Sequence, residues 1–343
     1  MITKGIQCMK DNEILVSIIC ATFNHGKYIR RCLEGFVSQK IDFPFEIIVH
    51  DDASTDDTAQ VIREFEARYP DIIRPIYQTE NQYSQKINIK QAHIMPIVRG
   101  QFVALCEGDD FWTDENKLQR QVDAMLAHPE CRMCTHKVAE VLEDGTPDGT
   151  FFPATPVSEG VLDSRRFLEL GQYYSFHTSS YFFHTEDYRE YVNNPPEFVR
   201  TSTVGDEAHL MYFGQLGPVY YLDQVMSHYR RGVAGSWTAR QRASSQKTLE
   251  HPRRMIQTYL AFDSYTGGKY HDLMARRIGR QMAILVTLEK TAASMLKVEN
   301  REYFNALSSA RKGFILASAV LPGPMKAFYL RRLGQMDRNH GIK

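Results

Sequence analysis

Two pairs of acidic residues, each placed after a short apolar run, are the side chains in this sequence best suited to chemistry. Asp51-Asp52 follow the run 46–50, and Asp109-Asp110 follow a second run and a glycine. Two such pairs at one edge of a sheet repel each other and raise one another's pKa unless a cation compensates them. Mg²⁺ or Mn²⁺ takes oxygen ligands, typically one or two protein carboxylates together with substrate phosphates. The pairs therefore predict a phosphate compound that brings its own metal.

The elements that must position these acids alternate between strand and helix. Apolar runs predict buried strands, and spaced apolar residues predict helices between them. The expected strands are 14–20, 46–50, 73–77 and 102–106, and the expected helices include one within 86–98 and one capped by Thr113. This alternation predicts an α/β fold with a doubly wound, mostly parallel sheet, in which ligands bind outside the carboxyl ends of the strands. Both acidic pairs and Ala21-Thr22-Phe23-Asn24 lie at such ends.

Other interpretations of the acidic pairs remain open. Asp51-Asp52-Ala53-Ser54 alone could be turn and cap chemistry. A receiver-like, metal-binding regulatory protein has a similar acidic pocket, but it would fill a third of this chain and needs a lysine after its last strand. Nucleotidyl transfer to a sugar phosphate expects a basic, Gly-rich loop after the first strand, which Thr22-Phe23-Asn24-His25-Gly26 does not supply. A protein that binds a nucleotide sugar without turnover is also compatible with the motifs.

Three segments resemble the successive motifs of family 2 glycosyltransferases. They are Val16 to Asn24, Glu46 to Thr58 and Ala104 to Asp114. The form Leu-Cys-Glu-Gly-Asp-Asp-Phe-Trp-Thr-Asp, followed by Lys117-Leu118-Gln119-Arg120-Gln121, is similar to the bacterial subset that builds capsular and lipopolysaccharide chains. The resemblance implies a GT-A fold, a nucleotide-diphosphate sugar donor, expected to be a UDP-sugar, and inversion at the anomeric carbon. It is specific over about 14–130 and looser to about 237.

The same resemblance implies roles for residues that bind the donor. Phe23 takes the base-stacking position, Asp52 reads the base, and Asp109 approaches the ribose or the sugar. Asp110 holds the Mg²⁺ or Mn²⁺ that bridges the diphosphate. Donor contacts are also expected from Ala21, where the family often has Pro or Thr, and from Arg230. Related sequences often have a histidine shortly after the Tyr-Arg pair, but none follows Tyr229-Arg230 here.

An inverting displacement needs a general base for the acceptor hydroxyl. Asp206 matches the family position for this base, at the start of a predicted helix, and Glu207 is the alternative. An ordinary helix cap is the alternative interpretation of this pair. By the same resemblance, His177, Thr178 and Trp112 are expected to face the donor sugar or the acceptor.

Charge and composition define the rest of the chain. With 43% hydrophobic and 24% charged residues among 343, the chain is a folded globular protein. Lys and Arg number 22 against 34 Asp and Glu in 1–237, and 19 against 7 in 238–343, so the two parts carry −12 and +12. We therefore expect a glycosyltransferase domain over 1–237, with a nucleotide-binding half about 14–137 and an acceptor half about 138–237, followed by a basic helical region over 238–343.

The basic region predicts an anionic partner. The family's acceptors are often saccharides or lipid-linked saccharides at a membrane, so an anionic membrane surface is expected rather than nucleic acid. A solvated helical surface is the alternative. Residues 1–13 lack a secretory signal, and Gly313 to Leu321 is about half the ~18 apolar residues that span a bilayer. We expect a cytoplasmic protein that is peripheral at the inner face of the cell membrane.

Overall fold

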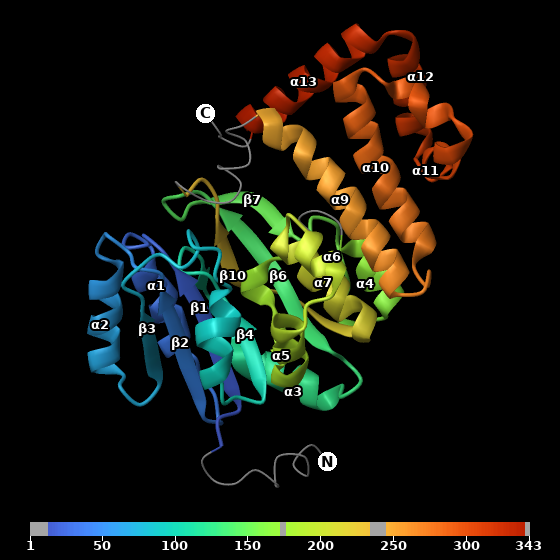
Figure 1. Ribbon diagram of the computed structural model, residues 1–343. Coiled ribbons are helices and arrows are strands. Elements are labelled where there is room, and N and C mark those ends of the chain that lie inside the picture. Colours follow the sequence, from blue (N-terminus) through green and yellow to red (C-terminus); the bar gives the residue numbers. More distant parts are fainter. Residues whose placement is uncertain (1–12, 172–175, 234–244, 340–343) are drawn as a thin grey trace. The chain divides into compact units, whose positions relative to one another are not determined.

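The computed structural model describes residues 13–171, 176–233 and 245–339, and its strands form one mixed sheet (Figure 1). Within these residues the sheet has ten strands, in the order β3-β2-β1-β4-β9-β6-β10-β5, with β7 beside β6 and β8 beside β10. The strands are β1 Val16–Thr22, β2 Phe45–Asp51, β3 Ile73–Tyr77, β4 Phe102–Leu105, β5 Phe111–Trp112, β6 Met133–Val141, β7 Pro147–Phe152, β8 Gly160–Leu162, β9 Phe182–His184 and β10 Val219–Arg230.

The first four strands form the parallel half of the sheet. β1 pairs in parallel with both β2 and β4, and β2 pairs in parallel with β3. The antiparallel strand β9 then joins β4 to β6. Because β2 and β4 flank β1, the loops that follow these three strands emerge at one edge. The doubly wound α/β arrangement predicted for this part of the chain is confirmed.

The helices connect and cover the strands. They are α1 Ile29–Val37, α2 Thr58–Arg68, α3 Lys117–Ala127, α4 Ser164–Leu170, α5 Thr185–Asn193, α6 Glu197–Thr201, α7 Gly205–Leu216, α9 Ser245–Tyr265, α10 His271–Glu289, α11 Arg301–Asn305, α12 Ser309–Val320 and α13 Pro322–Asn339. Shorter turns are the π-helix η2 Lys90–Ile94 and the 3₁₀-helices η3 Met95–Ile97, η4 Thr178–Ser180, η5 Ala292–Leu296 and η6 Val298–Asn300.

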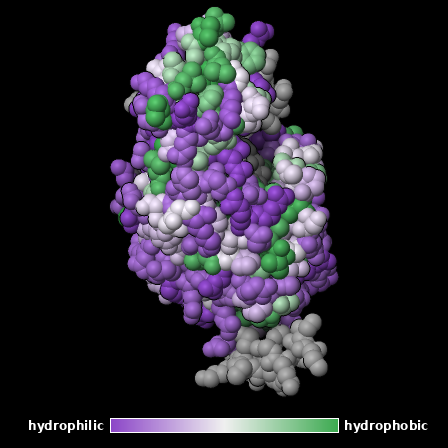
Figure 2. All heavy atoms as spheres, turned by 90° about the vertical axis from the view of Figure 1, so that its right-hand side faces the viewer, coloured by the Kyte–Doolittle hydropathy of each residue, from purple (hydrophilic) through white to green (hydrophobic). Residues whose placement is uncertain are grey.

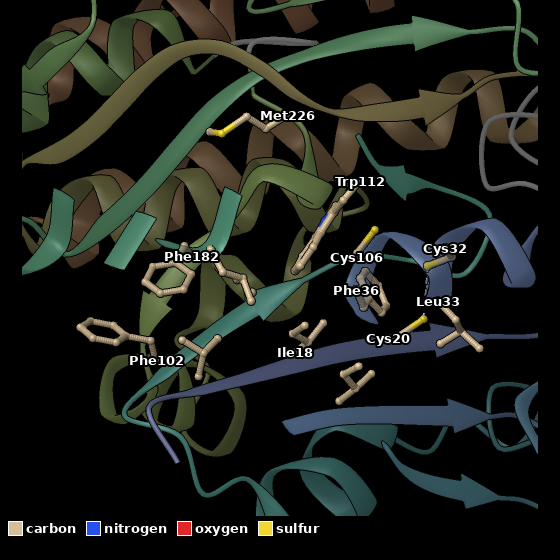
Figure 3. Close-up of a cluster of buried hydrophobic side chains, with 14 of the residues drawn as sticks. Ile18, Cys20, Cys32, Leu33, Phe36, Phe102, Cys106, Trp112, Phe182 and Met226 are labelled. Atoms are coloured by element: carbon tan, nitrogen blue, oxygen red, sulfur yellow. Dashed lines mark hydrogen bonds between the residues drawn. The ribbon is translucent and has the colours of Figure 1, made fainter. Parts of the chain in front are cut away.

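One face of the parallel half packs against α1, α2 and α3 (Figure 3). Side chains alternate along a strand, so Ile18 and Cys20 of β1 share this face. Phe36 of α1 and Trp112 lie in the same cluster, with ring centroids 4.6 Å apart. This buried layer fixes the strands whose carboxyl ends carry the acidic pairs.

The other face carries a cluster of aromatic side chains. Phe183 of β9 stacks on Phe213 of α7 at 3.9 Å between ring centroids, and on Tyr188 of α5 at 5.4 Å. All three side chains are fully buried. Stacked aromatic rings add stability beyond the area they bury, so this cluster fixes the later part of α7 and α5 beside β9.

The chain divides into two compact units. The first, the sheet unit, comprises Met1–Pro195 and Leu210–Arg231, and the second, the helical unit, comprises Pro196–His209 and Gly232–Lys343. Residues 196–209 group with the helices because α6 packs on α9: the rings of Phe198 and Phe262 lie 5.0 Å apart. The start of α7, predicted to lie in the glycosyltransferase domain, is therefore in the helical unit.

The helical unit has a core of its own. Val286, Met295 and Ile315 are buried together there, and α9 and α10 run side by side (Figure 1). No helix among the described residues combines the length and the hydropathy that crossing a bilayer requires.

Two predicted elements differ from the structure. The helix expected within 86–98 is only the short turns η2 and η3, because Pro96 removes a backbone donor within it. Thr113 does not cap the following helix: α3 begins at Lys117 with Asn116 as its N-cap residue. The Asp114 carboxylate accepts the Asn116 N–H at 2.8 Å instead, so a turn precedes the helix.

Candidate active site

The loops after β1 and β2 are tied together at the carboxyl edge of the sheet. The Asn24 side chain accepts the Thr55 N–H at 2.8 Å, and the Asn24 N–H donates to Ser54 Oγ at 2.8 Å. Asn24 and Ala53 both have left-handed backbones, with φ of 55° and 60°. A left-handed conformation disfavours an alanine side chain, so the backbone at Ala53 is strained.

Asp52 is positioned by a segment that sequence reasoning missed. Its side chain accepts the N–H groups of Gln82 at 2.7 Å and Tyr83 at 3.1 Å. The Tyr83 side chain is 65% exposed, and Phe23, the predicted base-stacking residue, is 44% exposed. Exposed aromatic rings are suited to stacking on a base. Tyr83 lies in a polar stretch without periodicity, and the only sequence signal there is an aromatic residue among polar ones.

Ala21 lies next to the end of β1 and connects its loop to the loop after β4. Its carbonyl accepts the Gly108 N–H at 3.1 Å. A Cβ atom at Gly108 would lie 2.7 Å from Thr22 Oγ1, too close for any side chain. Only glycine therefore allows the Asp109-Asp110 loop to approach β1 this closely.

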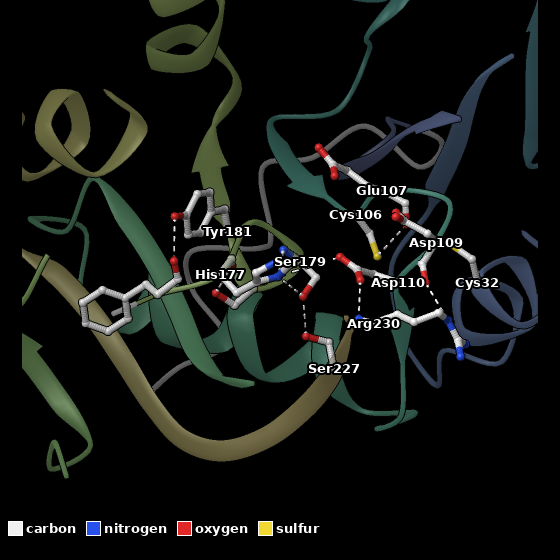
Figure 4. A network of polar contacts seen from close by, with 12 residues as sticks. Cys32, Cys106, Glu107, Asp109, Asp110, His177, Ser179, Tyr181, Ser227 and Arg230 are labelled. Atoms are coloured by element: carbon white, nitrogen blue, oxygen red, sulfur yellow. Dashed lines mark hydrogen bonds and ion pairs between the residues drawn. The ribbon is translucent and has the colours of Figure 1, made fainter. Parts of the chain in front are cut away.

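Asp110 is buried at this edge, and Arg230 holds its loop (Figure 4). The Arg230 N–H donates to Asp110 Oδ1 at 2.9 Å, and Arg230 Nε donates to the Asp109 carbonyl at 3.1 Å. The guanidinium also donates to the Glu143 carbonyl at 2.5 Å. These contacts make Arg230 a residue that positions the two acids, and its predicted contact with the donor stays a prediction.

The electrostatics of the loop favour a cation. Burial, and then the neighbouring charge of Asp109, raise the pKa of Asp110 well above its usual range. The Oδ1 atom of Asp109 and Oγ1 of Thr22 are buried without a hydrogen-bond partner among the described residues. Buried oxygens of this kind are costly unless a ligand satisfies them.

The two acids that were expected to share one ligand lie on strands that flank β1. Asp52 follows β2 and Asp110 follows β4. Neighbouring strands lie about 4.8 Å apart, so the ends of β2 and β4 are separated by roughly 10 Å. This separation is within the length of one nucleoside diphosphate, and it places both carboxylates at the same edge.

His177 lies beside Asp110, and the predicted contact of His177 and Thr178 with the donor sugar or the acceptor stays a prediction. His177 Nδ1 is 3.8 Å from Asp110 Oδ2. Ser179 Oγ bonds Ser227 Oγ of β10 at 2.8 Å, which holds the turn η4 in place. Thr178 is buried at the start of that turn.

The prediction that Trp112 faces the sugar or the acceptor is wrong. The Trp112 side chain is 4% exposed and packs in the core against α1, because β5 turns its apolar residues away from solvent. Beside it lies a residue that sequence reasoning missed, the fully buried Lys117, whose Nζ is 3.8 Å from the centre of the indole. Burial lowers the pKa of Lys117 to about 7.

A pocket of about 610 Å³ opens beside the Arg230 side chain. It is lined by Lys27, Tyr28, Arg31, Leu142, Glu143, Asp144 and Arg230. The Arg31 guanidinium lies 3.9 Å from the centre of the Phe111 ring, next to the acidic loop. The basic side chains suit this pocket to an anionic part of the donor or the acceptor.

The two candidates for the general base differ in their surroundings. Asp206 is half-buried in the first turn of α7. Glu207 is buried within the helical unit, where its carboxylate accepts the Tyr259 hydroxyl at 2.7 Å and pairs with Arg277 at 3.2 Å. Burial raises the pKa of Glu207. Glu207 thus takes part in the packing of the helical unit, and the assignment of the base to Asp206 stays a prediction.

The residues present fit a divalent cation that is shared with a substrate. Among the described residues, no group of three or more His, Cys, Asp or Glu side chains is arranged to hold a metal ion. Asp110 nevertheless offers a buried carboxylate with the hard oxygen atoms that Mg²⁺ and Mn²⁺ prefer. Such ions are usually bound by one or two carboxylates plus substrate phosphates, so a full protein cage is not required.

Comparison with known proteins finds a matching family and several relatives. Residues 17–183 match glycosyl transferase family 2. An uncharacterized protein of Mycobacterium tuberculosis is 35% identical over 225 residues, which cover 65% of this chain and 60% of that protein. An uncharacterized glycosyltransferase of Nostoc is 26% identical over 73% of this chain and 77% of its own length. The chain thus spans about three fifths of the mycobacterial relative.

Solved structures agree on the fold. The crystal structure of Staphylococcus aureus TarS residues 1–349 in complex with UDP-GlcNAc aligns with a TM-score of 0.54, at 17% identity over 89% of this chain and 81% of that one. The complex of the same protein with UDP gives 0.56, at 16% identity over 91% and 89%. The fold is therefore of the GT-A type, with additional C-terminal helices. Residues 17–183 are thus similar to glycosyl transferase family 2, and named relatives of this chain include glycosyltransferases.

Proposed function

We propose that this chain is an inverting glycosyltransferase that moves a sugar from a nucleotide-diphosphate donor to an acceptor hydroxyl. The single observation that carries this proposal is the placement of Asp52 and Asp110 at the carboxyl ends of the two strands that flank β1. The acceptor is a saccharide or a lipid-linked saccharide, in bacterial surface polysaccharide synthesis. A relative named putative teichuronic acid biosynthesis glycosyltransferase TuaG, from Bacillus subtilis and 27% identical over 41% of this chain, supports that setting.

The donor is proposed to lie across the carboxyl edge of the sheet. The exposed ring of Phe23 stacks on the base, and the Asp52 carboxylate accepts a hydrogen bond from it. The Gln82 and Tyr83 N–H groups hold that carboxylate in place. Ala21 lines the same site. The UDP and UDP-GlcNAc complexes of the structurally similar TarS support a UDP-sugar as the donor.

Asp110 is proposed to hold Mg²⁺ or Mn²⁺, and Asp109 to contact the ribose or the sugar. When bound, the cation neutralises the negative charge that develops on the departing diphosphate. Arg230 keeps both acids in position through its N–H and its Nε. His177, which lies next to Asp110, and the adjacent Thr178 are proposed to face the sugar or the acceptor.

Asp206 is proposed to be the general base. It accepts the proton of the acceptor hydroxyl as that oxygen attacks the anomeric carbon from the face opposite to the diphosphate, which inverts the configuration. A position in the first turn of α7 gives the carboxylate a fixed backbone. Glu207 helps to anchor the same turn through Tyr259 and Arg277.

The variant Asp206→Asn tests the base. It should lower turnover by at least about 10²-fold, the usual effect of losing a general base, while UDP affinity stays within about twofold. Asp272→Asn is the matched control, because Asp272 is also an acid in the first turn of a helix of the helical unit. Turnover follows from UDP release and affinity from calorimetry. Unchanged turnover in Asp206→Asn would refute the assignment of the base.

A panel of nucleotide sugars tests the donor class. Thermal shifts are measured with UDP-, GDP-, CMP- and dTDP-sugars, each with and without Mn²⁺. A ligand that binds only the folded state raises the midpoint, by about 2.7 kcal/mol of added stability at 100 times its dissociation constant. A metal-dependent shift with UDP-sugars alone supports the proposal. No shift with any nucleotide sugar would contradict it.

The helical unit is proposed to bind an anionic membrane surface. Large apolar side chains are exposed there, among them Val298 at 84%, Val320 at 77% and Phe328 at 52%. Figure 2 shows hydrophobic residues gathered at the top of the face in view, and Figure 1 has α12 at that height. Arg311 and Lys312 lie on α12, and Arg331 and Arg332 on α13. Exposed apolar and basic residues together suit an interfacial site on anionic lipid.

Co-sedimentation with vesicles tests this site. The protein should bind vesicles that contain phosphatidylglycerol at low salt, and high salt should release it. It should not bind vesicles of pure phosphatidylcholine. Val320→Glu, on the exposed face of α12, should weaken binding, whereas Val161→Glu on β8, also an exposed valine at 42%, should not. The site would be refuted if the protein sediments equally with and without anionic vesicles, or if it does not bind them.

A further inference from the structure

The two oxygen atoms of Asp110 have different surroundings. Oδ1 accepts the Arg230 N–H at 2.9 Å, whereas Oδ2 faces the His177 ring, 3.8 Å from Nδ1 (Figure 4). The Asp110 side chain is 2% exposed and that of His177 is 12% exposed. The histidine, which precedes the turn η4, thus faces the carboxylate oxygen that is not the acceptor of the Arg230 N–H.

The nitrogen that faces Asp110 acts as an acceptor. The Ser179 N–H, which can only donate, points to His177 Nδ1 at 3.3 Å. Nδ1 therefore carries a lone pair and no proton in this arrangement, with Ser179 Oγ as a second neighbour at 3.0 Å, and binding of a cation would replace the long contact to the Ser179 N–H. A neutral imidazole nitrogen of this kind is a common metal ligand. An electron-pair donor thus lies next to the carboxylate that is proposed to hold the cation.

The distance between the two atoms fits one shared ion. Ligand oxygen and nitrogen atoms lie about 2.0–2.2 Å from cations such as Mg²⁺ and Zn²⁺, so two ligands of one ion are at most about 4.4 Å apart. The observed 3.8 Å is below that limit. This distance is also too long for a direct hydrogen bond, so His177 and Asp110 do not share a proton.

The His177 ring is held in place before any ligand arrives. It packs on Tyr229 at 4.3 Å and on Phe152 at 5.8 Å between ring centroids. The Ser179–Ser227 bond fastens the same turn to β10. A ligand whose ring is fixed by packing loses little freedom on binding, which favours metal affinity.

We propose that His177, through Nδ1, is the second protein ligand of the divalent cation bound by Asp110. The inference rests on the proposed function, because it concerns the same cation. It assigns this role to the turn that precedes β9, since no histidine follows Tyr229-Arg230 in the sequence. In the described part of the loop after β10, the residues that follow Arg230 are Arg231, Gly232 and Val233.

Electron paramagnetic resonance of Mn²⁺ tests this ligand directly. With UDP present, Mn²⁺ bound to the full chain should show the hyperfine coupling of a directly bonded ¹⁴N atom. His177→Gln should abolish that coupling and weaken Mn²⁺ binding at least about tenfold, as for losses in metal-site ligation generally. His128→Gln, a histidine at the end of α3 outside the site, is the control and should change neither quantity.

A second variant separates ligation from a structural role. His177→Asp replaces a nitrogen with an oxygen ligand, and oxygen favours Mg²⁺ relative to Mn²⁺. This variant should keep metal-dependent UDP binding and shift its preference toward Mg²⁺. A residue that only packs would give no such shift. Retained nitrogen coupling in His177→Gln, with the fold intact by its thermal midpoint, would overturn the inference.

The outcomes distinguish this inference from the proposed function. If Asp110→Asn loses Mn²⁺ but His177→Gln keeps it with its nitrogen coupling, only the role of His177 fails. If the unmodified chain binds no Mn²⁺ in the presence of UDP, the proposed metal-dependent function itself fails.

Discussion

Two buried acids, Glu46 and Asp110, lie at opposite ends of the parallel strands and differ in their charged neighbours. Glu46, near the start of β2, is fully buried and has a complete set of partners: Ser17 Oγ at 2.6 Å, Arg74 at 2.9 Å and the Arg99 N–H at 2.9 Å. Asp110, after β4, is also buried, but the charged neighbours on its own loop, Asp109 and Glu107, are acids. The buried acid at the amino ends of the strands pairs with arginine side chains, whereas the one at the carboxyl ends accepts a backbone N–H, that of Arg230.

The pKa shifts of the two acids follow from these surroundings. Burial alone would raise the pKa of Glu46, but hydrogen bonds from Ser17, Arg74 and Arg99 outweigh it and lower that pKa. Burial and Asp109 both raise the pKa of Asp110. A buried carboxylate with built-in cations is structural, and one without them is suited to a ligand that brings a cation.

Glu207 extends the comparison to the helical unit, and there the largest effect is expected. Arg277→Met leaves the buried Glu207 carboxylate without its cation, which should lower the free energy of unfolding by about 3–5 kcal/mol. Urea denaturation of the full chain measures this. Arg276→Met, next to it but in an exposed pair with Asp272, should cost less than about 1 kcal/mol. Equal losses in the two variants would show that the buried pair does not matter.

Asp110→Asn should weaken function without weakening the fold. Losing the carboxylate should reduce Mn²⁺-dependent UDP affinity at least about 100-fold, or ~2.7 kcal/mol. Because the variant removes a buried charge that lacks a cation, its thermal midpoint should stay equal or rise. Calorimetry with and without Mn²⁺, together with thermal unfolding, measures both. A large loss of stability would place Asp110 with Glu46 as a structural acid.

Glu46→Gln should show the opposite pattern. It breaks charged hydrogen bonds and should cost about 2 kcal/mol of stability, with UDP affinity unchanged. The lowered pKa of Glu46 adds a pH test. Its stabilisation is fully present above the unfolded pKa of about 4.3 and is lost as the pH falls through the lower folded value. Urea midpoints between pH 3 and 7 should therefore vary less in Glu46→Gln than in the unmodified chain, and equal profiles would contradict this account.

Ala53→Gly should give the smallest effect, a gain in stability of up to about 1 kcal/mol. Ala53 has φ of 60°, where glycine pays no penalty for a side chain. Ala59→Gly in α2 is the matched control and should lose about 0.5–1 kcal/mol, because that backbone is helical. If both variants lose stability, the loop after β2 is not strained at this residue.

The sequence predicts the parallel half of the fold better than the site around it. β3 has the predicted bounds, and β1, β2 and β4 begin and end within about two residues of the predictions, because each is a continuous apolar run. Trp112 and Lys117 could not be predicted, since their burial depends on α1 packing across them. Arg74 and Arg99, the basic partners of Glu46, lie 28 and 53 residues away in the chain, so no local sequence pattern predicts these contacts.

The site residues were predictable only where they belong to a motif. Asp52, Asp109 and Asp110 follow apolar runs, and the structure places them at one edge of the sheet. The N–H groups that hold Asp52 come from the irregular segment 81–83, which has no periodic signal. The approach of His177 to Asp110 joins segments that are 67 residues apart and depends on the pairing of β9 with β4.

A crystal structure of the full chain with UDP and Mn²⁺ tests the central claim most directly. The account predicts one anomalous peak for manganese within bonding distance of Asp110 Oδ2, on the diphosphate of a nucleotide whose base lies against Phe23 and Asp52. Manganese away from Asp110, or a nucleotide that reaches only one of the two acids, would contradict it.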